Sequence, residues 1–490
     1  EQSRRYEGRG KCPGNLQIGR KKGIYTDHSN SRRKTDTEMR ILIKGAGDLA
    51  TGIASRLYHS GHQIVMTEIA VPLTVRRMAA LSRAVYEGTA VVEDMKGVLV
   101  YSEKEAEQVL ADGNIAVIVD ANAKIAAGLE PDVIVDAILA KRNTGTKITD
   151  APFVIGVGPG FTAGIDCNCV VETKRGHTLG NIFYSGSALP NTGIPGDVGG
   201  YTTERLIRAA ADGEMQPLAA IGDIVEKGQA VAVTGGKEVY ARMSGVIRGL
   251  LQPGVRVSEG LKIGDIDARC EKSHCFTISD KARAVGGGVL EAVTRHEHMK
   301  GKYALVLLAA GKSTRFGENK LLAQISGRQM FEYMLDKISA FGAFPTFIVT
   351  GYEEIEEKAR RKGIRVVRND EPELGISRSV RLGVEACTEQ FPDIQGILFS
   401  VCDQPALHTA TIQRILNAAG LHRGKIISAC HQGRPGNPVL WDKKFFHNLR
   451  RLSGDNGGRQ IMSGLQDKVR YVEAQEEELK DIDFRSDLSE

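Results

Sequence analysis

A short apolar run that ends in a glycine-rich turn occurs twice in this 490-residue chain, and this pattern restricts the possible folds most strongly. Residues 40–44 read RILIK and lead into GAGDLATG, whereas residues 303–308 read YALVLL and lead into AAGKSTRFGENK. A strand that runs through a glycine turn into a helix is the opening unit of an open, parallel α/β sheet. The sequence therefore predicts a multidomain α/β chain with a Rossmann-like domain near each end.

The first turn, Gly45-x-Gly47-x-x-Ala50, matches the dinucleotide-binding pattern. Gly45 permits the tight turn, Gly47 lets a pyrophosphate approach the backbone, and Ala50 allows close packing of helix on strand. Glu68 follows Gly47 by 21 residues, at the end of the next predicted strand, where it could accept a ribose hydroxyl. We expect residues 39–150 to bind NAD or another nucleotide, although a domain that has lost its cofactor would show the same pattern.

Predicted strands at 115–119 and 133–135 precede a glycine-rich segment at residues 151–215, which begins with a further predicted strand at 153–157. The sequence predicts a helix over 202–211, entered through two glycines, where an anion could bind. Three side chains are candidate ligand contacts in this segment: Arg175, His177 and Asp197. A turn-rich connector that needs positive φ angles explains the segment equally well.

Residues 216–270 have short predicted strands, frequent glycines and two IGD triplets, and they resemble the barrel-sandwich fold of biotinyl and lipoyl domains. Lys237 stands near the expected hairpin tip, but the flanking residues of a carrier lysine are absent. We therefore expect a structural or docking barrel. Residues 271–301 are predicted to be a helical linker, and the three glycines 286–288 imply a close neighbour if they are helical.

The second turn is not a P-loop, because Val306 stands where the first glycine of that motif is required. It still follows the carboxyl end of a parallel strand, which is where α/β folds bind ligands. Arg315 and Lys320 could neutralise a triphosphate and hold it in line for attack at its α-phosphate. The predicted nucleotide-binding residues of this loop are Ala309, Ala310, Gly311, Lys312, Ser313 and Gly317.

Asp403 follows the predicted strand at 396–401 and is placed to hold Mg²⁺ against phosphates. The loop 308–320, of the form LAAGxSxRFGxxK, closely resembles the signature of nucleotidyltransferases that act on molybdopterin, and its Ala-Ala pair resembles the cytidylyltransferase branch. Five more segments resemble this family, in this order along the chain: EPELGISRSV, CDQP, GRPGNPVLW, GDNGGR and the terminal DIDFRSDL. One departure is Pro435, which is inserted between Arg434 and Gly436.

This resemblance implies that residues 302–490 form a MobA-like domain that transfers CMP from CTP to molybdopterin and releases pyrophosphate. Lys320, Arg315 and Asp403 would be the catalytic residues, and Asp403 with Asp483 would hold the metal. Earlier segments, including IKGAGDLATGIASRL and NTGIPGDVGGYTTERL, resemble YqeB-type proteins of the selenium-dependent molybdenum hydroxylase system. The chain thus resembles a fusion of two maturation factors, with the molybdenum cofactor and a hydroxylase apo-enzyme as implied partners.

Three alternatives remain open on the sequence. A sugar- or polyol-phosphate nucleotidyltransferase could use the same fold, although the Ala-Ala-Gly loop favours the molybdopterin branch. An NAD-dependent oxidoreductase would need an acid/base pair near the first turn, and none is evident. A non-enzymatic chaperone that inserts the molybdenum cofactor could use both nucleotide folds for binding alone.

The charge and composition of the chain limit the classes of partner that it is expected to bind. Residues 1–38 contain ten Lys/Arg and five Asp/Glu, so this segment accounts for the whole net charge of +5 (10 − 5), and the remainder is neutral. We therefore expect a disordered basic extension at 1–38, which need not belong to the native protein, and no nucleic-acid partner. No apolar run reaches the ~18 residues that a membrane span requires, and no signal peptide is evident, so a cytoplasmic protein without a membrane partner is expected.

The eight cysteines form no CxxC pair. This favours reduced structural thiols over a soft-metal site at residues 167–169 or 270–275.

Overall fold

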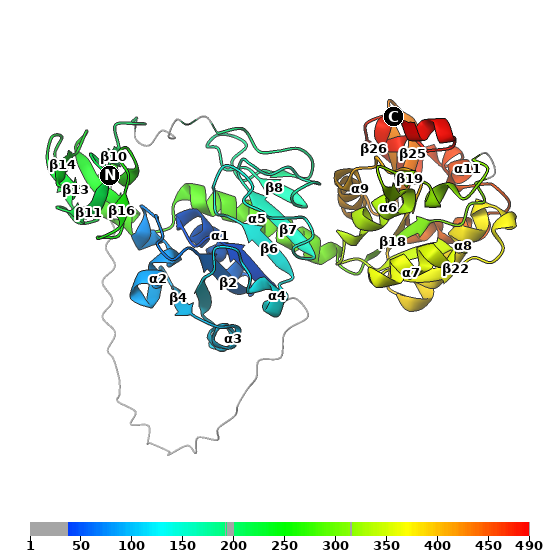
Figure 1. Ribbon diagram of the computed structural model, residues 1–490, viewed down its shortest axis with the longest axis horizontal. Coiled ribbons are helices and arrows are strands. Elements are labelled where there is room, and N and C mark those ends of the chain that lie inside the picture. Colours follow the sequence, from blue (N-terminus) through cyan, green and yellow to red (C-terminus); the bar gives the residue numbers. More distant parts are fainter. Residues whose placement is uncertain (1–37, 192, 194–199, 314–315, 490) are drawn as a thin grey trace, which may run out of the picture. The chain divides into compact units, whose positions relative to one another are not determined.

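The computed structural model describes residues 38–191, 193, 200–313 and 316–489 (Figure 1). Residues 1–37 of the predicted basic extension lie outside this part, as do Asp197 and Arg315. The described residues form mixed α/β structure with several sheets.

The first sheet has nine strands in the order β3-β4-β5-β2-β1-β6-β7-β8-β9. All neighbouring pairs are parallel except β3 with β4 and β8 with β9. The strands are β1 (Arg40–Lys44), β2 (Gln63–Glu68), β3 (Thr89–Val92), β4 (Met95–Val100), β5 (Ile115–Val119), β6 (Val133–Asp136), β7 (Phe153–Val157), β8 (Cys169–Val171) and β9 (Ile182–Phe183). Since β1 lies between β2 and β6, the strand order reverses at β1, and α/β sheets bind ligands at such a point.

Helix α1 (Asp48–His59) and helix α5 (Asp280–Met299) cover the same core of this sheet. Their backbones meet at two glycines: a Cβ on Gly52 would lie 2.5 Å from the Cβ of Ala282, and one on Gly286 would lie 2.5 Å from the carbonyl oxygen of Gly52. The triple glycine thus does have a close neighbour, and the segment predicted as a linker contributes buried side chains to the first core. The second core, on other residues of the same strands, is covered by α3 (Glu103–Ala111) and α4 (Ala126–Leu129).

His296, on α5, gives the first core a pH-sensitive element. Its ring stacks on Phe153 with 4.2 Å between the ring centroids, and burial, with the charge of Lys300 nearby, lowers the pKa of His296 from 6.5 to about 4. The unfolded chain therefore takes up this proton near pH 6.5 while the folded chain resists it, so stability present above pH 6.5 is lost as the pH falls towards 4. We expect His296→Leu to remove about 1–2 kcal/mol of the destabilisation between pH 7 and pH 5.

The measurement is the thermal midpoint at pH 7 and at pH 5 for the wild type, His296→Leu and a control, His422→Leu, at an exposed histidine. The control should keep the wild-type difference between the two pH values. An unchanged difference in His296→Leu would contradict the assignment of this pH dependence to His296.

The middle of the chain forms two four-stranded sheets, β10-β17-β15-β12 and β14-β13-β11-β16, around one small core. Their strands are β10 (Leu206–Arg208), β11 (Gly213–Pro217), β12 (Ile224–Val225), β13 (Ala230–Thr234), β14 (Lys237–Tyr240), β15 (Gly245–Leu250), β16 (Arg256–Val257) and β17 (Lys262–Asp267). The helix predicted over 202–211 is wrong: residues 206–208 are a strand, because Leu206 and Ile207 are buried and pair with β17. Lys237 is exposed at the start of β14.

The last sheet has seven strands in the order β22-β21-β18-β23-β25-β24-β26, and only β25 is antiparallel to its neighbours. The strands are β18 (Tyr303–Leu308), β21 (Thr346–Thr350), β22 (Arg365–Arg368), β23 (Gly396–Val401), β24 (Ile426–His431), β25 (Arg434–Asp442) and β26 (Val469–Glu473). The helices are α6 (Met330–Ser339), α7 (Glu353–Arg361), α8 (Ile376–Gln390), α9 (Thr409–Leu421), α10 (Phe446–Arg450) and α11 (Gly458–Ser463). The strand order reverses at β18, between β21 and β23.

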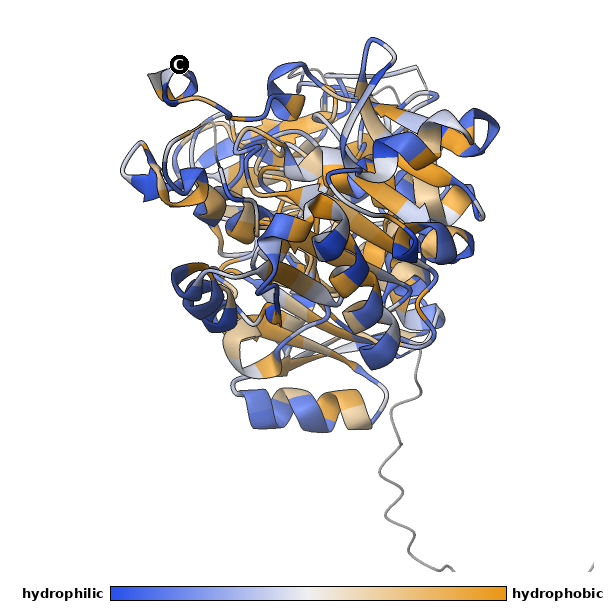
Figure 2. Cartoon of the chain, turned by 90° about the vertical axis from the view of Figure 1, so that its right-hand side faces the viewer, coloured by the Kyte–Doolittle hydropathy of each residue, from blue (hydrophilic) through white to orange (hydrophobic). Residues whose placement is uncertain are grey.

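Apolar residues follow the strands and the inner faces of the surrounding helices, and polar residues cover the outer faces (Figure 2). Helix α7 shows how the sequence specifies such an element: three glutamates stand in its first turn and three basic residues in its last, which complements the helix dipole. Within the described ranges, no helix is long and apolar enough to cross a bilayer.

Candidate active site

The loop after β18 forms one wall of a cavity of about 440 Å³. Ala309 and Ala310 are buried, and the carbonyl oxygens of Ala309 and Gly311 accept hydrogen bonds from the hydroxyls of Thr350 (3.1 Å) and Tyr352 (2.9 Å). The predicted residues 310–313 line the cavity. Ala309 does not line the cavity, and neither does Gly317, which occupies an exposed turn with φ +83°. Because Arg315 lies outside the described residues, its role stays a prediction.

Lys320 joins two carboxylates from distant parts of the chain. Its Nζ lies 2.7 Å from Oδ2 of Asp403 and 2.8 Å from Oδ1 of Asp483. Burial disfavours the charged ammonium, but the two aspartates outweigh it and hold the pKa of Lys320 above its ordinary value. The structure thus brings together three of the residues that the sequence selected for catalysis and metal binding.

Strand ends position this cluster. Asp403 follows the carboxyl end of β23, which lies beside β18 in the sheet. Asp483 arrives from the C-terminal segment, where the backbone amide of Ile482 donates to the carbonyl oxygen of Asp403 at 3.0 Å. The loop after β18 and the cluster therefore meet at the reversal point of the sheet.

The aspartates fit a divalent cation. Oδ1 of Asp403 is buried and has no hydrogen-bond partner among the described residues, although a buried carboxylate oxygen normally has one. Carboxylate oxygens are the ligands that Mg²⁺ and Mn²⁺ prefer. Asp403 and Asp483 would thus hold such an ion at the edge of the cavity.

A second cavity, of about 300 Å³, adjoins the first and shares Leu308, Ile376 and Val401 with it. Its wall comes from the segments 433–441 and 454–459, which the sequence singled out as motifs. Trp441 supplies an aromatic face, and Arg459 is held by a hydrogen bond from its Nη2 to the carbonyl oxygen of Pro435 at 3.1 Å. Two ligands could therefore bind side by side, with the Lys320 cluster in the wall of the first cavity.

Asp481 is a site residue that the sequence reasoning missed. It lines the second cavity and accepts a hydrogen bond from Nε2 of Gln404 at 2.8 Å. Burial, with the nearby charge of Asp403, raises the pKa of Asp481 to about 6. The alternation Asp481-Ile482-Asp483 was the available signal, because residues two apart in extended chain share a face.

The glycine turn of the first sheet borders a separate cavity of about 390 Å³, which Gly45, Gly47, Ala50 and Glu68 all line. The reasons for glycine differ between positions 45 and 47. Gly45 has φ +95°, and a Cβ there would lie 3.0 Å from the carbonyl oxygen of Ala137, so the backbone itself requires it. A Cβ on Gly47 would meet only Oγ1 of Thr74, at 3.5 Å, so protein packing does not require glycine at this position.

Glu68 lies where the predicted ribose contact was expected, but its carboxylate folds back onto the turn. Its Oε2 accepts from the backbone amide of Ala46 at 3.0 Å, and its Oε1 accepts from that of Ile69 at 2.9 Å. Burial outweighs these bonds and raises the pKa of Glu68. Glu68 therefore fixes the shape of the turn as well as lining the cavity.

Other sequence candidates do not join a described cavity. Arg175 is paired with Asp280 at 2.8 Å, and His177 is exposed. Burial raises the pKa of the Cys167 thiol to about 12 and that of Cys169 well above its usual value, as expected of structural thiols. In the part of the chain that the structure describes, no cluster of three or more His, Cys, Asp or Glu side chains is arranged to hold a metal ion.

Comparison with known proteins identifies the domain that holds the Lys320 cluster. Residues 305–470 match the family model of the MobA-like NTP transferase domain. The chain carries a MobA-like NTP transferase domain. This confirms the prediction of a nucleotidyltransferase, and the MobA-like domain contains the loop after β18, Lys320 and Asp403.

The chain is also 47% identical over 258 residues to a protein of Escherichia coli K12 named "Uncharacterized protein YqeB". The match covers 53% of this chain and 48% of YqeB, so it spans about half the length of that relative. The predicted combination of a YqeB-like part with a MobA-like domain is thus confirmed.

Two further matches are more distant. The bifunctional protein GlmU of Bifidobacterium animalis subsp. lactis is 28% identical over 119 residues, which are 23% of this chain and 26% of GlmU. The crystal structure of Rv0371c from Mycobacterium tuberculosis H37Rv aligns with 38% of this chain and 95% of its own, at 25% identity and a TM-score of 0.34.

Proposed function

We propose that the MobA-like domain is a molybdenum cofactor cytidylyltransferase, which transfers CMP from CTP to the terminal phosphate of molybdenum-loaded molybdopterin. The carrying observation is the Lys320 cluster, which lines the first of two adjoining cavities. One cavity would take the nucleotide and the other the acceptor. The resemblance of the Ala-Ala-Gly loop to the cytidylyltransferase branch supports CTP as the donor.

In this reaction the protein has to position the two phosphates and to neutralise their negative charge. An oxygen of the acceptor phosphate attacks the α-phosphorus of CTP, a new P–O bond forms, and the bond to the bridging oxygen of the β-phosphate breaks to release pyrophosphate. The acceptor oxygen is already anionic, so no side chain has to remove a proton. Rate acceleration would come from alignment of the two phosphates and from cations that neutralise the developing charge.

Lys320 is the described cation best placed for this work. Its ammonium is held between Asp403 and Asp483 and can donate to a phosphate oxygen in the cavity that all three line. Lys312 lies across the cavity, 3.4 Å from Glu373, and could bind an outer phosphate. A divalent cation held by Asp403 and Asp483 would add a Lewis acid that polarises the phosphate oxygens.

The second cavity fits an acceptor with an extended ring system. Trp441, Phe399 and Met462 give it apolar walls, while Asp481 and Gln404 put polar groups at the end near the cluster. An aromatic or bicyclic heterocycle could stack there while its phosphate reaches Lys320. The MobA-like domain would then act in the maturation of molybdenum hydroxylases, with the apo-enzyme as the receiver of the product.

The test is incubation of the purified chain with Mg²⁺, molybdenum-loaded molybdopterin and either CTP or GTP, followed by pyrophosphate release and product mass. We expect a cytidine dinucleotide with CTP and little product with GTP. A guanosine dinucleotide as the main product would contradict the proposed donor. No product with either nucleotide would contradict the proposed acceptor.

A second candidate is a sugar- or polyol-phosphate nucleotidyltransferase, which the similarity to GlmU favours. It predicts pyrophosphate release with a sugar phosphate or polyol phosphate in place of molybdopterin. The apolar walls of the second cavity speak against it, because a sugar acceptor is usually held by a denser set of polar side chains.

A further inference from the structure

A fourth cavity, of about 540 Å³, lies between helices α5 and α9 and shares no lining residue with the other three. It is the largest of the four. Leu290 and Met299 of α5 and Leu421 of α9 give it apolar walls, and Leu421 is 65% exposed although its side chain is apolar. A roomy apolar cavity with a few polar groups is the usual form of a small-molecule binding site.

The triple glycine of α5 contributes to the room in this cavity. Gly286 is required by packing, because a Cβ there would lie 2.5 Å from the carbonyl oxygen of Gly52. Gly288 is required for the same reason, since its Cβ would lie 2.1 Å from the carbonyl oxygen of Gly180. Gly287 differs from both: it lines the cavity, and a Cβ there would meet nothing within 4 Å. Because glycine is less favourable than alanine inside a helix, neither packing nor helix formation accounts for Gly287.

Asn417 of α9 has an unused hydrogen-bond donor in the wall of this cavity. It is 7% exposed, and its Oδ1 accepts a hydrogen bond from Nε2 of Gln413 at 3.3 Å. Its Nδ2 is buried and has no hydrogen-bond partner among the described residues. Buried amide donors are almost always bonded, so a ligand oxygen would supply the acceptor that the protein lacks here.

Positive charge borders the same cavity. His298 lines it and contacts two cations, since Nη2 of Arg423 lies 2.7 Å from its Nε2 and Nζ of Lys302 lies 3.2 Å from its Nδ1. The charge of Lys302, followed by burial and the charge of Arg423, lowers the pKa of His298, so the ring stays neutral between them. Within the described ranges, neither cation of this His298 group (His298, Lys302 and Arg423) pairs with a carboxylate. Arg295, which also lines the cavity, lies 3.9 Å from the exposed Glu291, too far for a hydrogen bond.

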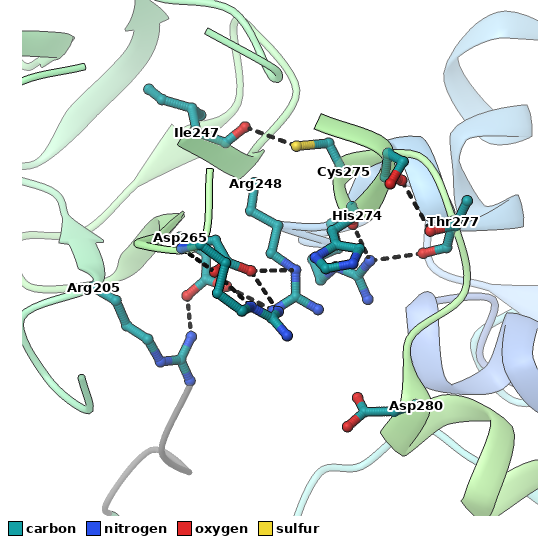
Figure 3. Close-up of polar contacts among 12 residues, drawn as sticks. Arg205, Ile247, Arg248, Asp265, His274, Cys275, Thr277 and Asp280 are labelled. Atoms are coloured by element: carbon teal, nitrogen blue, oxygen red, sulfur yellow. Dashed lines mark hydrogen bonds and ion pairs between the residues drawn. The ribbon is translucent and has the colours of Figure 1, made fainter. Parts of the chain in front are cut away.

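The arginines of the middle domain show the usual arrangement. Arg205 and Arg248 both contact the buried carboxylate of Asp265 (Figure 3). Arg76 likewise pairs with Asp48, at 3.4 Å. The His298 group differs in having cations without acids, and such a group is stabilised by an anion that approaches it.

We propose that the cavity between α5 and α9 binds an apolar organic acid. The carboxylate would accept a hydrogen bond from Nδ2 of Asn417 and lie close to Arg295 and the His298 group. The hydrocarbon part would run along α5 to the open space at Gly287. Eight residues separate Gly287 from Arg295, about 12 Å along the helix, which suits an alkyl chain of medium length or a fused ring system.

The experiment uses the full chain, titrated calorimetrically with octanoate, naphthoate and the uncharged octanol. The variants are Gly287→Leu, which fills the open space, and Arg423→Gln, which removes one cation. Arg451→Gln is the control, at an exposed arginine of the MobA-like domain. We expect one acid molecule to bind per chain, equally in the wild type and the control. Binding should be at least tenfold weaker in Gly287→Leu and about threefold weaker in Arg423→Gln, whose cation is exposed.

The three probes distinguish the form of the acid. Tighter binding of naphthoate would identify an aromatic acid as the ligand, and tighter binding of octanoate an aliphatic one. Octanol should bind at least tenfold more weakly than octanoate, because it lacks the charge that the His298 group and Arg295 attract. Octanol as tight as octanoate, no binding of either acid, or unchanged binding in Gly287→Leu would overturn the proposal.

Gly287→Ala separates a ligand site from a structural requirement for glycine. Alanine is the better helix former, so the thermal midpoint of the ligand-free variant should be unchanged or higher, while the acid binds more weakly. A midpoint several degrees lower would show that the packing of the protein itself requires glycine at this position, which would also overturn the proposal.

Discussion

Replacing Asp403 with asparagine is expected to lower metal-dependent nucleotidyl transfer by about 10³-fold or more while the domain stays folded. Asp403 provides the buried Oδ1 without a partner and the Oδ2 that contacts Lys320, so it would hold both the metal ion and the lysine. The amide of asparagine keeps the shape but loses the charge. Neither cation would then be fixed against the phosphates.

The measurement is the initial rate of pyrophosphate release at saturating Mg²⁺, with the thermal midpoint as the check on folding. Asp393→Asn is a matched control, since Asp393 is an exposed aspartate just before the same strand. Wild-type turnover in Asp403→Asn would remove Asp403 from the catalytic machinery. A large loss in the control as well would point to a general effect of lost surface charge.

Lys320→Met is expected to lower transfer by about 10²–10³-fold and to change how the protein responds to metal. In the absence of metal, Lys320 is a counter-ion shared by Asp403 and Asp483, with Asp481 nearby. Without it, like charges repel, and we expect the thermal midpoint to fall by about 2–4 °C in EDTA. Mn²⁺ or Mg²⁺ should restore this loss, because the ion now meets no competing ammonium.

The predicted change in the response to metal can be measured without an activity assay. The rise of the midpoint on adding Mn²⁺ is compared among the wild type, Lys320→Met and the control Lys362→Met, at an exposed lysine of the same domain. The rise should be largest in Lys320→Met and equal in the other two. An equal rise in all three would mean that the metal binds away from the Lys320 cluster.

Much of the fold was predictable, because several strands are apolar runs that are followed directly by a recognisable motif, either a glycine-rich turn or an acidic residue. The runs before Gly45, Ala309 and Asp403 became β1, β18 and β23 with the expected bounds. The helix expected at 202–211 failed for the opposite reason. Half of its ten residues are apolar, but pairing of residues 206–208 with β17, far along the chain, decided their conformation over local preference.

The candidate site was predictable residue by residue but not in its arrangement. Lys320, Asp403 and Asp483 were each selected from motifs, yet nothing local indicates that one ammonium bridges both carboxylates. Asp481 was not selected from the sequence, because its raised pKa depends on burial beside Asp403, and only the tertiary structure brings these two residues together.

The glycine contact between α1 and α5 decides where this chain can be divided for protein production. Helix α5 follows the middle domain in sequence, yet Ala282, Val285 and Val289 are fully buried in the first core. A fragment that stops at residue 270 would leave the apolar side of α1 in water and so expose an adhesive surface. A fragment meant to keep the glycine-turn cavity must therefore include α5. A separate MobA-like domain would lose a core side chain if it began after Met299, because Met299 is buried in the core of that domain.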